Sequence, residues 1–159
     1  MNKIAVVTGG SGGIGRCTAA SLKAAGCTVY EISRRDIPSD GIIHMSADVT
    51  DEAQVRRVID EIAAREGRID ILVNNAGFGI SGAAELTESR DSHAQLELNV
   101  FGTDNVTRAV LPHMRAQGGG RIVCMSSIAG IVPIPFQLWY SVSKAAIIAY
   151  VLALQNEVR

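Results

Sequence analysis

Several features that point to other classes of protein are scarce in this sequence of 159 residues. Lys and Arg together number 15 against 16 Asp and Glu, so the chain lacks the basic excess that binds nucleic acid or acidic membranes. Only three cysteines are present, Cys17, Cys27 and Cys124. Their odd number and their spacing argue against a disulfide framework and against a metal site. We expect all three to be small buried residues, with no metal bound.

Long apolar runs are missing at the N-terminus, where residues 4–7 form only a short apolar stretch. This stretch is too short for a signal peptide or a membrane span, which indicates a soluble, cytoplasmic protein without membrane or nucleic-acid partners. Internal repeats and low-complexity segments are also missing. With 47% hydrophobic residues, the chain can build one domain with a substantial core, and we assign residues 1–159 to a single domain.

The first strong pattern in the sequence is a strand, a glycine-rich turn and a helix. Residues 4–8 are apolar, residues 9–15 are mostly glycine, and a helical stretch follows at 16–25, before Gly26. Residues 27–33 predict a second strand and so complete a βαβ unit. A turn without side chains lets its backbone approach a diphosphate, and the helix N-terminus offers free N–H groups. The pattern predicts dinucleotide binding, with a tight connection that binds nothing as the alternative.

The end of the second predicted strand bears on the choice of cofactor. A fold that binds NAD places a carboxylate there for the ribose hydroxyls, whereas a 2′-phosphate calls for arginine. Here the strand ends in Ser33, Arg34 and Arg35, and the nearest carboxylate, Glu31, lies two residues before Ser33. A guanidinium suits bidentate contact with a phosphate. The sequence therefore favours NADP over NAD, with a solvated pair of arginines as the alternative.

The rest of the chain alternates between strand and helix patterns. Further strands are predicted at 42–45, 69–74 and 121–126, and further helices at 51–66, 89–117 and 139–158. Thr50 is the predicted N-cap of the helix at 51–66, whose charged residues form a solvated face. Its predicted inner face consists of Val55, Val58, Ile59 and Ile62. Asn99 lies inside the helix at 89–117, where its amide competes for backbone hydrogen bonds, so its presence there invites a reason.

Tyr140 and Lys144 are four residues apart in the last predicted helix, so they lie on one helix face. A nearby ammonium favours the phenolate form of a tyrosine and suits it to proton transfer near neutral pH. The spacing alone fits an ordinary surface pair equally well. Ser127 adds to the pattern because it follows the strand at 121–126, and ligands bind at the carboxyl ends of strands in such sheets.

Four separate motifs together resemble the short-chain dehydrogenase/reductase family across nearly the whole chain. They are Thr8-Gly9-x-x-x-Gly13-Ile14-Gly15, Asp48-Val49, Asn74-Asn75-Ala76-Gly77, and the ordered set Asn99, Ser127, Tyr140 and Lys144. The resemblance implies a Rossmann-type, doubly wound α/β fold of three layers, with five parallel strands in the order 3-2-1-4-5. It selects Gly9, Gly13 and Gly15 as the cofactor glycines. The fingerprint Gly10-x-Gly12-x-x-Gly15 is a second match, which places a diphosphate at the same helix N-terminus.

The resemblance also implies a function, which is hydride transfer between NADP(H) and a carbonyl or alcohol. The implied cofactor contacts are Gly9, Ser11, Gly13, Ile14, Gly15, Ser33, Arg34, Asp48, Val49, Asn75, Ala76, Gly77, Tyr140 and Lys144. Tyr140 is the implied general acid and base, and Ser127, chosen over Ser126 by its spacing from Tyr140, is the implied partner of the substrate oxygen. Lys144 is implied to act on Tyr140 and to bind the nicotinamide ribose, and Asn99 to hold a water.

Three further expectations depend on how this chain compares with the family pattern. The last strands of the family pattern do not follow Arg159, so we expect an incomplete domain in which residues 121–126 form an exposed sheet edge. The helices at 89–117 and 140–158 resemble those that pair subunits, so a homo-oligomer is expected. The apolar residues 131–139 indicate either a hydrophobic substrate or buried loop packing. A non-catalytic nucleotide-binding scaffold of the same fold is the alternative function.

Overall fold

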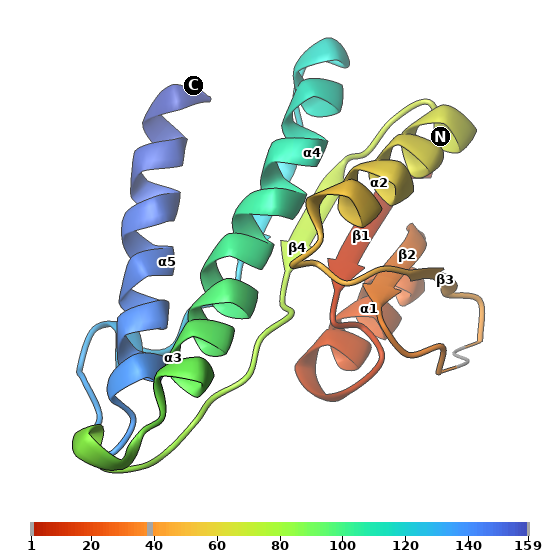
Figure 1. The fold of residues 1–159 in the computed structure, drawn as a ribbon. Helices are drawn as coiled ribbons and strands as arrows, with labels where there is room; N and C mark the ends of the chain where they lie inside the picture. Colours follow the sequence, from red (N-terminus) through yellow and green to blue (C-terminus); the bar gives the residue numbers. More distant parts are fainter. Residues whose placement is uncertain (1, 38–39, 159) are drawn as a thin grey trace.

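The computed structural model describes residues 2–37 and 40–158, which form one parallel sheet covered by helices (Figure 1). The strands are β1 (Ile4–Thr8), β2 (Thr28–Ser33), β3 (Ile43–Ser46), β4 (Ile71–Asn74) and β5 (Arg121–Cys124). Their order in the sheet is β3-β2-β1-β4-β5, and every neighbouring pair is parallel. The expected Rossmann-type sheet and its strand order are therefore confirmed.

The helices follow the sequence pattern with one interruption. The α-helices are α1 (Gly13–Ala24), α2 (Glu52–Glu66), α3 (Ser89–Leu96), α4 (Gly102–Ala116) and α5 (Leu138–Glu157). Two short 3-10 helices are η1 (Ala84–Leu86) and η3 (Ile128–Gly130). The single helix predicted at 89–117 is wrong in detail, because a π-helical turn, η2 (Glu97–Phe101), separates α3 from α4. A π turn is a local break in the i to i+4 pattern, often found at functional sites.

Helices cover both faces of the sheet and create two cores. On one face, α2 and α4 pack side by side against β1, β2 and β4 (Figure 1). The predicted inner face of α2 is confirmed, since Val55, Val58, Ile59 and Ile62 are fully buried. On the other face, Ala19 of α1 packs with Val7, Val29 and Val73 in a smaller core. The central strands β1, β2 and β4 are mostly buried, as expected of a parallel sheet, whereas the edge strand β5 alternates between exposed and half-buried residues.

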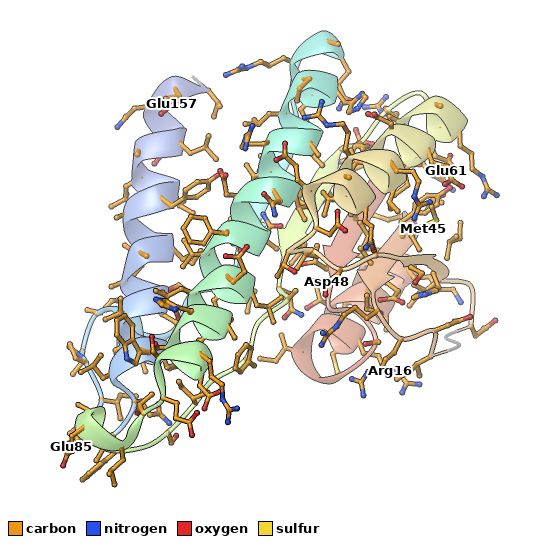
Figure 2. The ribbon with its side chains drawn as sticks, viewed as in Figure 1. Arg16, Met45, Asp48, Glu61, Glu85 and Glu157 are labelled. Atoms are coloured by element: carbon orange, nitrogen blue, oxygen red, sulfur yellow. The ribbon has the colours of Figure 1, made fainter. Side chains whose placement is uncertain are left out.

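The N-cap of α2 differs from the prediction by one residue. Asp51, not Thr50, caps the helix, and its carboxylate accepts hydrogen bonds from the N–H groups of Ala53 and Gln54, both at 3.0 Å. The Thr50 hydroxyl instead donates to Asp48 Oδ1 at 2.8 Å, which explains why it does not cap. The charged outer face of α2 is confirmed, and Figure 2 shows Glu61 directed away from the sheet.

The cysteines are more exposed than predicted. Cys17 is exposed, while Cys27 and Cys124 are half-buried. Cys17 lies two positions from both Gly15 and Ala19, which are the buried residues of α1, and two positions on a helix turn a side chain to the opposite face. Burial raises the pKa of the Cys124 thiol. Within residues 2–37 and 40–158, no three His, Cys, Asp or Glu side chains are close enough together to hold a metal ion.

One described helix, α5, is long and apolar enough to cross a membrane by composition, with a mean hydropathy of 1.3 over its window. Its first half carries the buried polar residues Ser141, Ser143 and Lys144. These side chains bond to neighbouring segments of the fold. We therefore interpret α5 as a helix of the folded domain, since core helices pass the same test.

Tyr30 on β2 makes the stability of the fold sensitive to alkaline pH. Its ring is buried, and its hydroxyl donates to Glu66 at the end of α2. Burial, together with that hydrogen bond, raises the pKa of Tyr30 to about 12. The unfolded chain loses this proton first, near pH 10. The contribution of Tyr30 is therefore complete below about pH 10 and is lost as the pH rises to about 12.

We expect urea unfolding to show a loss on the order of 2 kcal/mol between pH 10 and 12 in the wild type. The Tyr30→Phe variant is expected to be less stable at neutral pH, because it lacks the hydrogen bond to Glu66. Its alkaline loss should be smaller than that of the wild type, and what remains comes from Tyr150, whose pKa is also raised by burial and by its hydrogen bond to Asp104. If the free energy of unfolding of Tyr30→Phe fell above pH 10 as steeply as that of the wild type, this account would be contradicted.

Candidate active site

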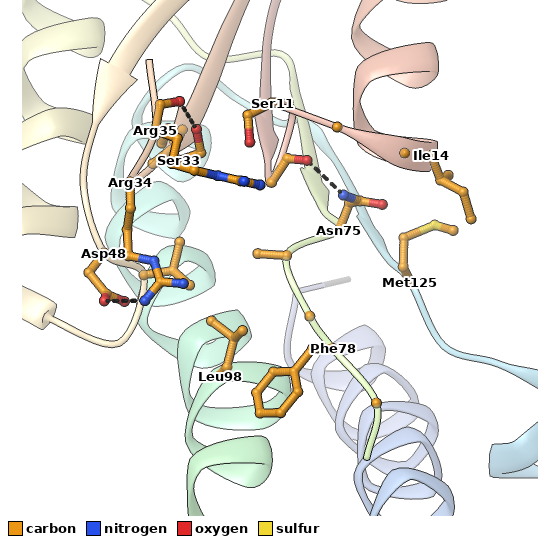
Figure 3. A pocket seen from close by; sticks show the side chains of 18 of the residues that line it. Ser11, Ile14, Ser33, Arg34, Arg35, Asp48, Asn75, Phe78, Leu98 and Met125 are labelled. Carbon is orange, nitrogen blue, oxygen red and sulfur yellow. Dashed lines mark hydrogen bonds and ion pairs between the residues drawn. The ribbon is translucent and has the colours of Figure 1, made fainter. Parts of the chain in front are cut away.

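A cleft of 620 Å³ opens at the carboxyl ends of the strands, between the glycine turn, the end of β2, the segment after β4 and the start of α5 (Figure 3). The predicted residues that line it are Gly9, Ser11, Gly13, Ile14, Ser33, Arg34, Asp48, Val49, Asn75, Ala76, Gly77, Tyr140 and Lys144. Further lining residues, which were not among the implied cofactor contacts, are Gly12, Ile32, Arg35, Ala47, Phe78, Gly79, Leu98, Met125 and Ser126. The fold thus brings distant motifs to one cleft.

The glycine turn has the form of an anion-binding cradle. Gly12 caps α1 in an extended conformation with no side-chain hydrogen bond, and the first turn of α1 contains no acidic residue. Gly13 has φ +52° and open space where a Cβ would stand. The first N–H groups of α1 therefore have no side-chain acceptor at the cap, and Gly12, Gly13 and Ile14 at this helix end line the cleft. Free N–H groups and the helix dipole both favour a phosphate at this position.

Gly15 is the predicted cofactor residue that does not line the cleft. It is buried beneath the turn, and a Cβ there would lie 2.4 Å from both Asn75 Nδ2 and Gly9 O. Asn75 fastens the turn to the end of β4, since its Nδ2 donates to Thr8 O at 3.0 Å and to Gly9 O at 3.3 Å. Gly15 therefore has a positioning role, because it lets α1 start close to Asn75.

Thr8 is a further residue of this region that the sequence reasoning did not assign to the site. Its Oγ1 accepts hydrogen bonds from the N–H groups of Asn75 and Ala76, both at 3.0 Å. These bonds join the end of β1 to the segment after β4. Its position directly before Gly9 in the first motif was the signal that could have identified it.

At the far end of the cleft, the end of β2 faces the segment after β3. Arg34 extends toward Asp48, with Arg34 Nη1 3.7 Å from Asp48 Oδ2 (Figure 3). The Arg34 side chain remains 73% exposed, which leaves it free to contact a phosphate. Glu31, the carboxylate considered for NAD, is buried and does not line the cleft. This corner therefore presents the Arg34 guanidinium to the cleft, while the Glu31 carboxylate is kept away from it.

Tyr140 and Lys144 share one face of α5, as the spacing predicts. Lys144 Nζ lies 5.8 Å from the centroid of the Tyr140 ring and donates to Met125 O at 2.8 Å. Burial lowers the pKa of Lys144. Within the described residues, the Tyr140 hydroxyl makes no hydrogen bond. The arrangement places a proton-carrying phenol and an ammonium at the wall of one cleft.

Asn99 lies in the π turn η2, and its amide is fully engaged. Its Nδ2 donates to Phe78 O at 2.9 Å and to Ser143 Oγ at 3.0 Å, while its Oδ1 accepts from Phe78 N at 3.0 Å. Asn99 is 1% exposed and does not line the cleft. The amide fastens the segment after β4 to α5. Ser143, which the motifs did not single out, completes the link by donating to Tyr140 O at 2.8 Å.

Ser127 also lies outside the residues that line the cleft. It caps η3, where its Oγ accepts from Ala129 N at 3.2 Å, so its hydroxyl proton is still available as a donor. Ser126 does line the cleft, but its hydroxyl donates to Lys144 O at 2.8 Å. The Ser126 hydroxyl is therefore bound to the α5 backbone, whereas the Ser127 hydroxyl acts as an acceptor at η3.

The apolar segment between Ser127 and Tyr140 lies on the surface. Ile131 is 71% exposed, Val132 59% and Phe136 69%. Buried loop packing, one of the two readings of this segment, is therefore wrong for the described chain. An exposed group of apolar side chains next to Tyr140 is the kind of surface that binds an apolar molecule.

Comparison with known proteins agrees with the cleft and the sheet. The family model for short chain dehydrogenases matches residues 3–159. The 3-ketodihydrosphingosine reductase of Bacteroides thetaiotaomicron is 42% identical over 157 residues, which are 98% of this chain and 58% of that protein. The 3-oxoacyl-acyl-carrier-protein reductase FabG of Thermotoga maritima is 34% identical over 157 residues, 92% of this chain and 64% of that protein. The chain therefore spans about three fifths of the length of these curated relatives.

Solved structures show the same fold. A short-chain dehydrogenase from Streptomyces avermitilis superposes with a TM-score of 0.94 at 39% identity, covering 99% of this chain and 61% of that one. A gluconate 5-dehydrogenase from Burkholderia cenocepacia, solved with NADP and tartrate, gives a TM-score of 0.92 at 32% identity over 99% of this chain and 66% of that one. Because the family model, these relatives and the parallel sheet agree along almost the whole chain, the protein belongs to the short-chain dehydrogenase family and is related to its oxidoreductases.

Proposed function

We propose that this chain carries the cofactor site and the proton-transfer residues of an NADP(H)-dependent oxidoreductase that acts on a hydrophobic carbonyl or alcohol. The observation that carries the proposal is that Tyr140 and Lys144 line the same cleft as the glycine turn and Arg34. An ordinary surface pair of Tyr and Lys has no reason to lie at the wall of a dinucleotide-shaped cleft. The glycine cradle and the exposed guanidinium are what a cofactor with two phosphate groups and a 2′-phosphate requires.

The bound cofactor supplies the hydride, and the residues of this chain orient the reactants and move the proton. Tyr140 donates its proton to the carbonyl oxygen in reduction and accepts it in oxidation. Ser127 donates a hydrogen bond to the same oxygen and stabilises the charge that develops there. Lys144 holds a positive charge beside the phenol and is placed to bind ribose hydroxyls. We keep the proposal that Asn99 helps to hold a water near Lys144, through the backbone of its π turn.

The substrate class is proposed from the surface around Tyr140. Ile131, Val132 and Phe136 are exposed in the segment that precedes α5, and apolar side chains of this kind favour an apolar substrate. The name of the Bacteroides relative describes a reductase of a sphingoid ketone. We therefore propose a ketone with a long apolar chain as the substrate class.

A non-catalytic nucleotide-binding scaffold is the second candidate function. The observation that favours it is that Ile131 and Phe136, in the apolar segment before α5, are exposed within the described residues. Cofactor binding without turnover of any hydrophobic ketone would support this candidate. The proposed cytoplasmic location and the proposed homo-oligomer apply to both candidates. Leu152 of α5 and Phe101 of η2, both more than half exposed, offer apolar contacts for a second subunit.

The first test is the affinity of the chain for NADPH and for NADH, measured separately by the fluorescence of the reduced nicotinamide. We expect the wild type to bind NADPH more tightly. Arg34→Gln is expected to weaken NADPH binding about tenfold to hundredfold and NADH binding much less, because it removes charge-assisted hydrogen bonds to the 2′-phosphate.

Arg108→Gln is the matched control for this experiment, since Arg108 is a half-exposed arginine on α4 that does not line the cleft. It should change neither affinity. If Arg34→Gln lost affinity for NADPH and for NADH equally, Arg34 would not bind the 2′-phosphate.

A further inference from the structure

Two ionisable side chains beside the cleft take no part in the proposed mechanism. Glu31 of β2 and His44 of β3 are partners in the parallel register, and His44 Nδ1 contacts Glu31 Oε1. Their side chains are only 3% and 17% exposed. Across residues 2–37 and 40–158, neither Glu31 Oε2 nor His44 Nε2 has a hydrogen-bond partner. A buried carboxylate with so few partners is costly unless a positive charge balances it.

Glu31 lies next to the two regions that we propose to contact phosphate groups, the glycine turn and the end of β2. A Cβ on Gly10, in the glycine turn, would be 2.6 Å from Glu31 Cβ and 3.2 Å from Glu31 Oε2, so the carboxylate packs directly against the turn. Glu31 Oε1 also lies 3.3 Å from Ser33 Oγ, whose shorter hydrogen bond, at 2.9 Å, is donated to Arg35 O. Ser33 lines the cleft next to Arg34. A net charge on this buried pair therefore acts on a phosphate at that corner with little water to screen it.

The sign of that charge matters for a cofactor with a 2′-phosphate. An unbalanced carboxylate at Glu31 would repel the phosphate that Arg34 attracts. His44 is the ion-pair partner that the described residues provide for Glu31. His44 Nδ1 contacts Glu31 Oε1 within the buried pair, so a positive charge on the imidazole would lie directly against the carboxylate and offset it.

We propose that His44 is a specificity-determining residue, which cancels the charge of the buried Glu31 carboxylate and thereby allows the corner at Ser33 and Arg34 to accept a 2′-phosphate. This inference rests on the proposed preference for NADP. His44 acts through Glu31 and through the charge of the corner, so it is a positioning residue and not a catalytic one.

The test measures the NADPH and NADH affinities of the 159-residue chain by nicotinamide fluorescence, in the wild type and in His44→Gln. Glutamine keeps a polar group in the place of the ring but cannot carry the balancing proton. We expect the ratio of NADPH affinity to NADH affinity to fall about fivefold to tenfold, because a dianionic phosphate feels the uncompensated carboxylate more strongly. Adding Glu31→Gln to His44→Gln removes that carboxylate, and the ratio should return toward the wild-type value.

His113→Gln is the matched control, because His113 pairs with Asp60 at 2.9 Å between α4 and α2, away from the cleft. It should leave the ratio unchanged. An unchanged ratio in a folded His44→Gln variant, or a double variant that fails to recover, would overturn the inference. If His44→Gln does not fold, the single variant Glu31→Gln decides. We expect it to keep or raise the ratio of NADPH affinity to NADH affinity. A fall in this ratio would overturn the charge argument.

The two proposals fail in distinguishable ways. A wild type that prefers NADH would remove the proposed NADP preference, while the change of the ratio in His44→Gln would still decide the role of His44. A clear NADPH preference that His44→Gln leaves intact would remove only the present inference. Failure of the wild type to bind either nucleotide would overturn both.

Discussion

Replacing Tyr140 with phenylalanine is expected to reduce NADPH-dependent turnover of a long-chain ketone by about 10³-fold, within the range found for the loss of a general acid. The variant keeps the ring against Lys144 and loses only the hydroxyl that we propose as the proton donor. Since this hydroxyl makes no hydrogen bond within the described residues, the melting temperature should stay close to that of the wild type. Affinity for NADPH should change by no more than about twofold, because the phosphate contacts remain.

Tyr150→Phe is the matched control, since it removes a tyrosine hydroxyl from the same helix away from the cleft. The Tyr150 hydroxyl donates to Asp104 Oδ1 at 3.0 Å, and its loss should lower the free energy of unfolding by about 1 kcal/mol. Turnover should remain near the wild-type rate. Tyr140→Phe should therefore lose activity but keep its stability, whereas Tyr150→Phe should lose stability but keep its activity. Turnover of the ketone that survives in Tyr140→Phe would show that the acid has been assigned to the wrong residue.

Gly15→Ala is expected to lower the free energy of unfolding by about 3 kcal/mol, at the upper end of the cost of overpacking. The added Cβ would lie 2.4 Å from both Gly9 O and Asn75 Nδ2, so the glycine turn must move away from β4. Helix propensity alone predicts the opposite sign, because alanine stabilises a helix interior by up to about 1 kcal/mol relative to glycine. NADPH affinity should fall together with stability, since the displaced turn no longer presents its N–H groups to the diphosphate.

Gly12→Ala provides the comparison for stability within the same turn. Gly12 has an extended backbone, and no atom lies within 4 Å of where its Cβ would stand. The free energy of unfolding of Gly12→Ala should therefore stay within about 1 kcal/mol of the wild-type value. The small loss reflects the poorer N-cap that alanine makes. If Gly15→Ala and Gly12→Ala were equally stable, the close approach of α1 to Asn75 would not be needed by the fold.

The sheet and most helices could be predicted from the sequence because they depend on local patterns. The apolar run at 4–8 and the inner-face residues of α2, such as Val55 and Ile62, show strand and helix periodicities that short segments carry by themselves. The spacing of Tyr140 and Lys144 is local as well, which is why their shared helix face could be predicted. The N-cap of α2 is an instructive failure, because Thr50 and Asp51 are both favoured N-cap types, with Asp the stronger of the two. The hydrogen bond of Thr50 to Asp48 decided between them.

The bonds that organise the site could not be predicted, because they join segments far apart in the chain. Asn99 was recognised as an unusual helix residue, yet its partner Ser143 is 44 residues away. Nothing in the sequence near Asn99 indicates a π turn or a bond to Phe78. The exposure of Cys17 and of the apolar segment at 131–138 likewise depends on what packs beside them, which a local pattern does not contain.

The sequence by itself determined the family, the order of the helices and strands, and the types of side chain that face the cleft. Short motifs and periodic apolar positions are enough to indicate each of these. Only the tertiary structure decided that Glu31 is buried against His44 beneath Gly10, that Gly15 supports the turn from below, and that Ser127 caps η3 outside the lining of the cleft. The physical reason is that burial and hydrogen-bond partners are properties of packing between distant segments, which the same residues can satisfy in several ways until the fold brings them together.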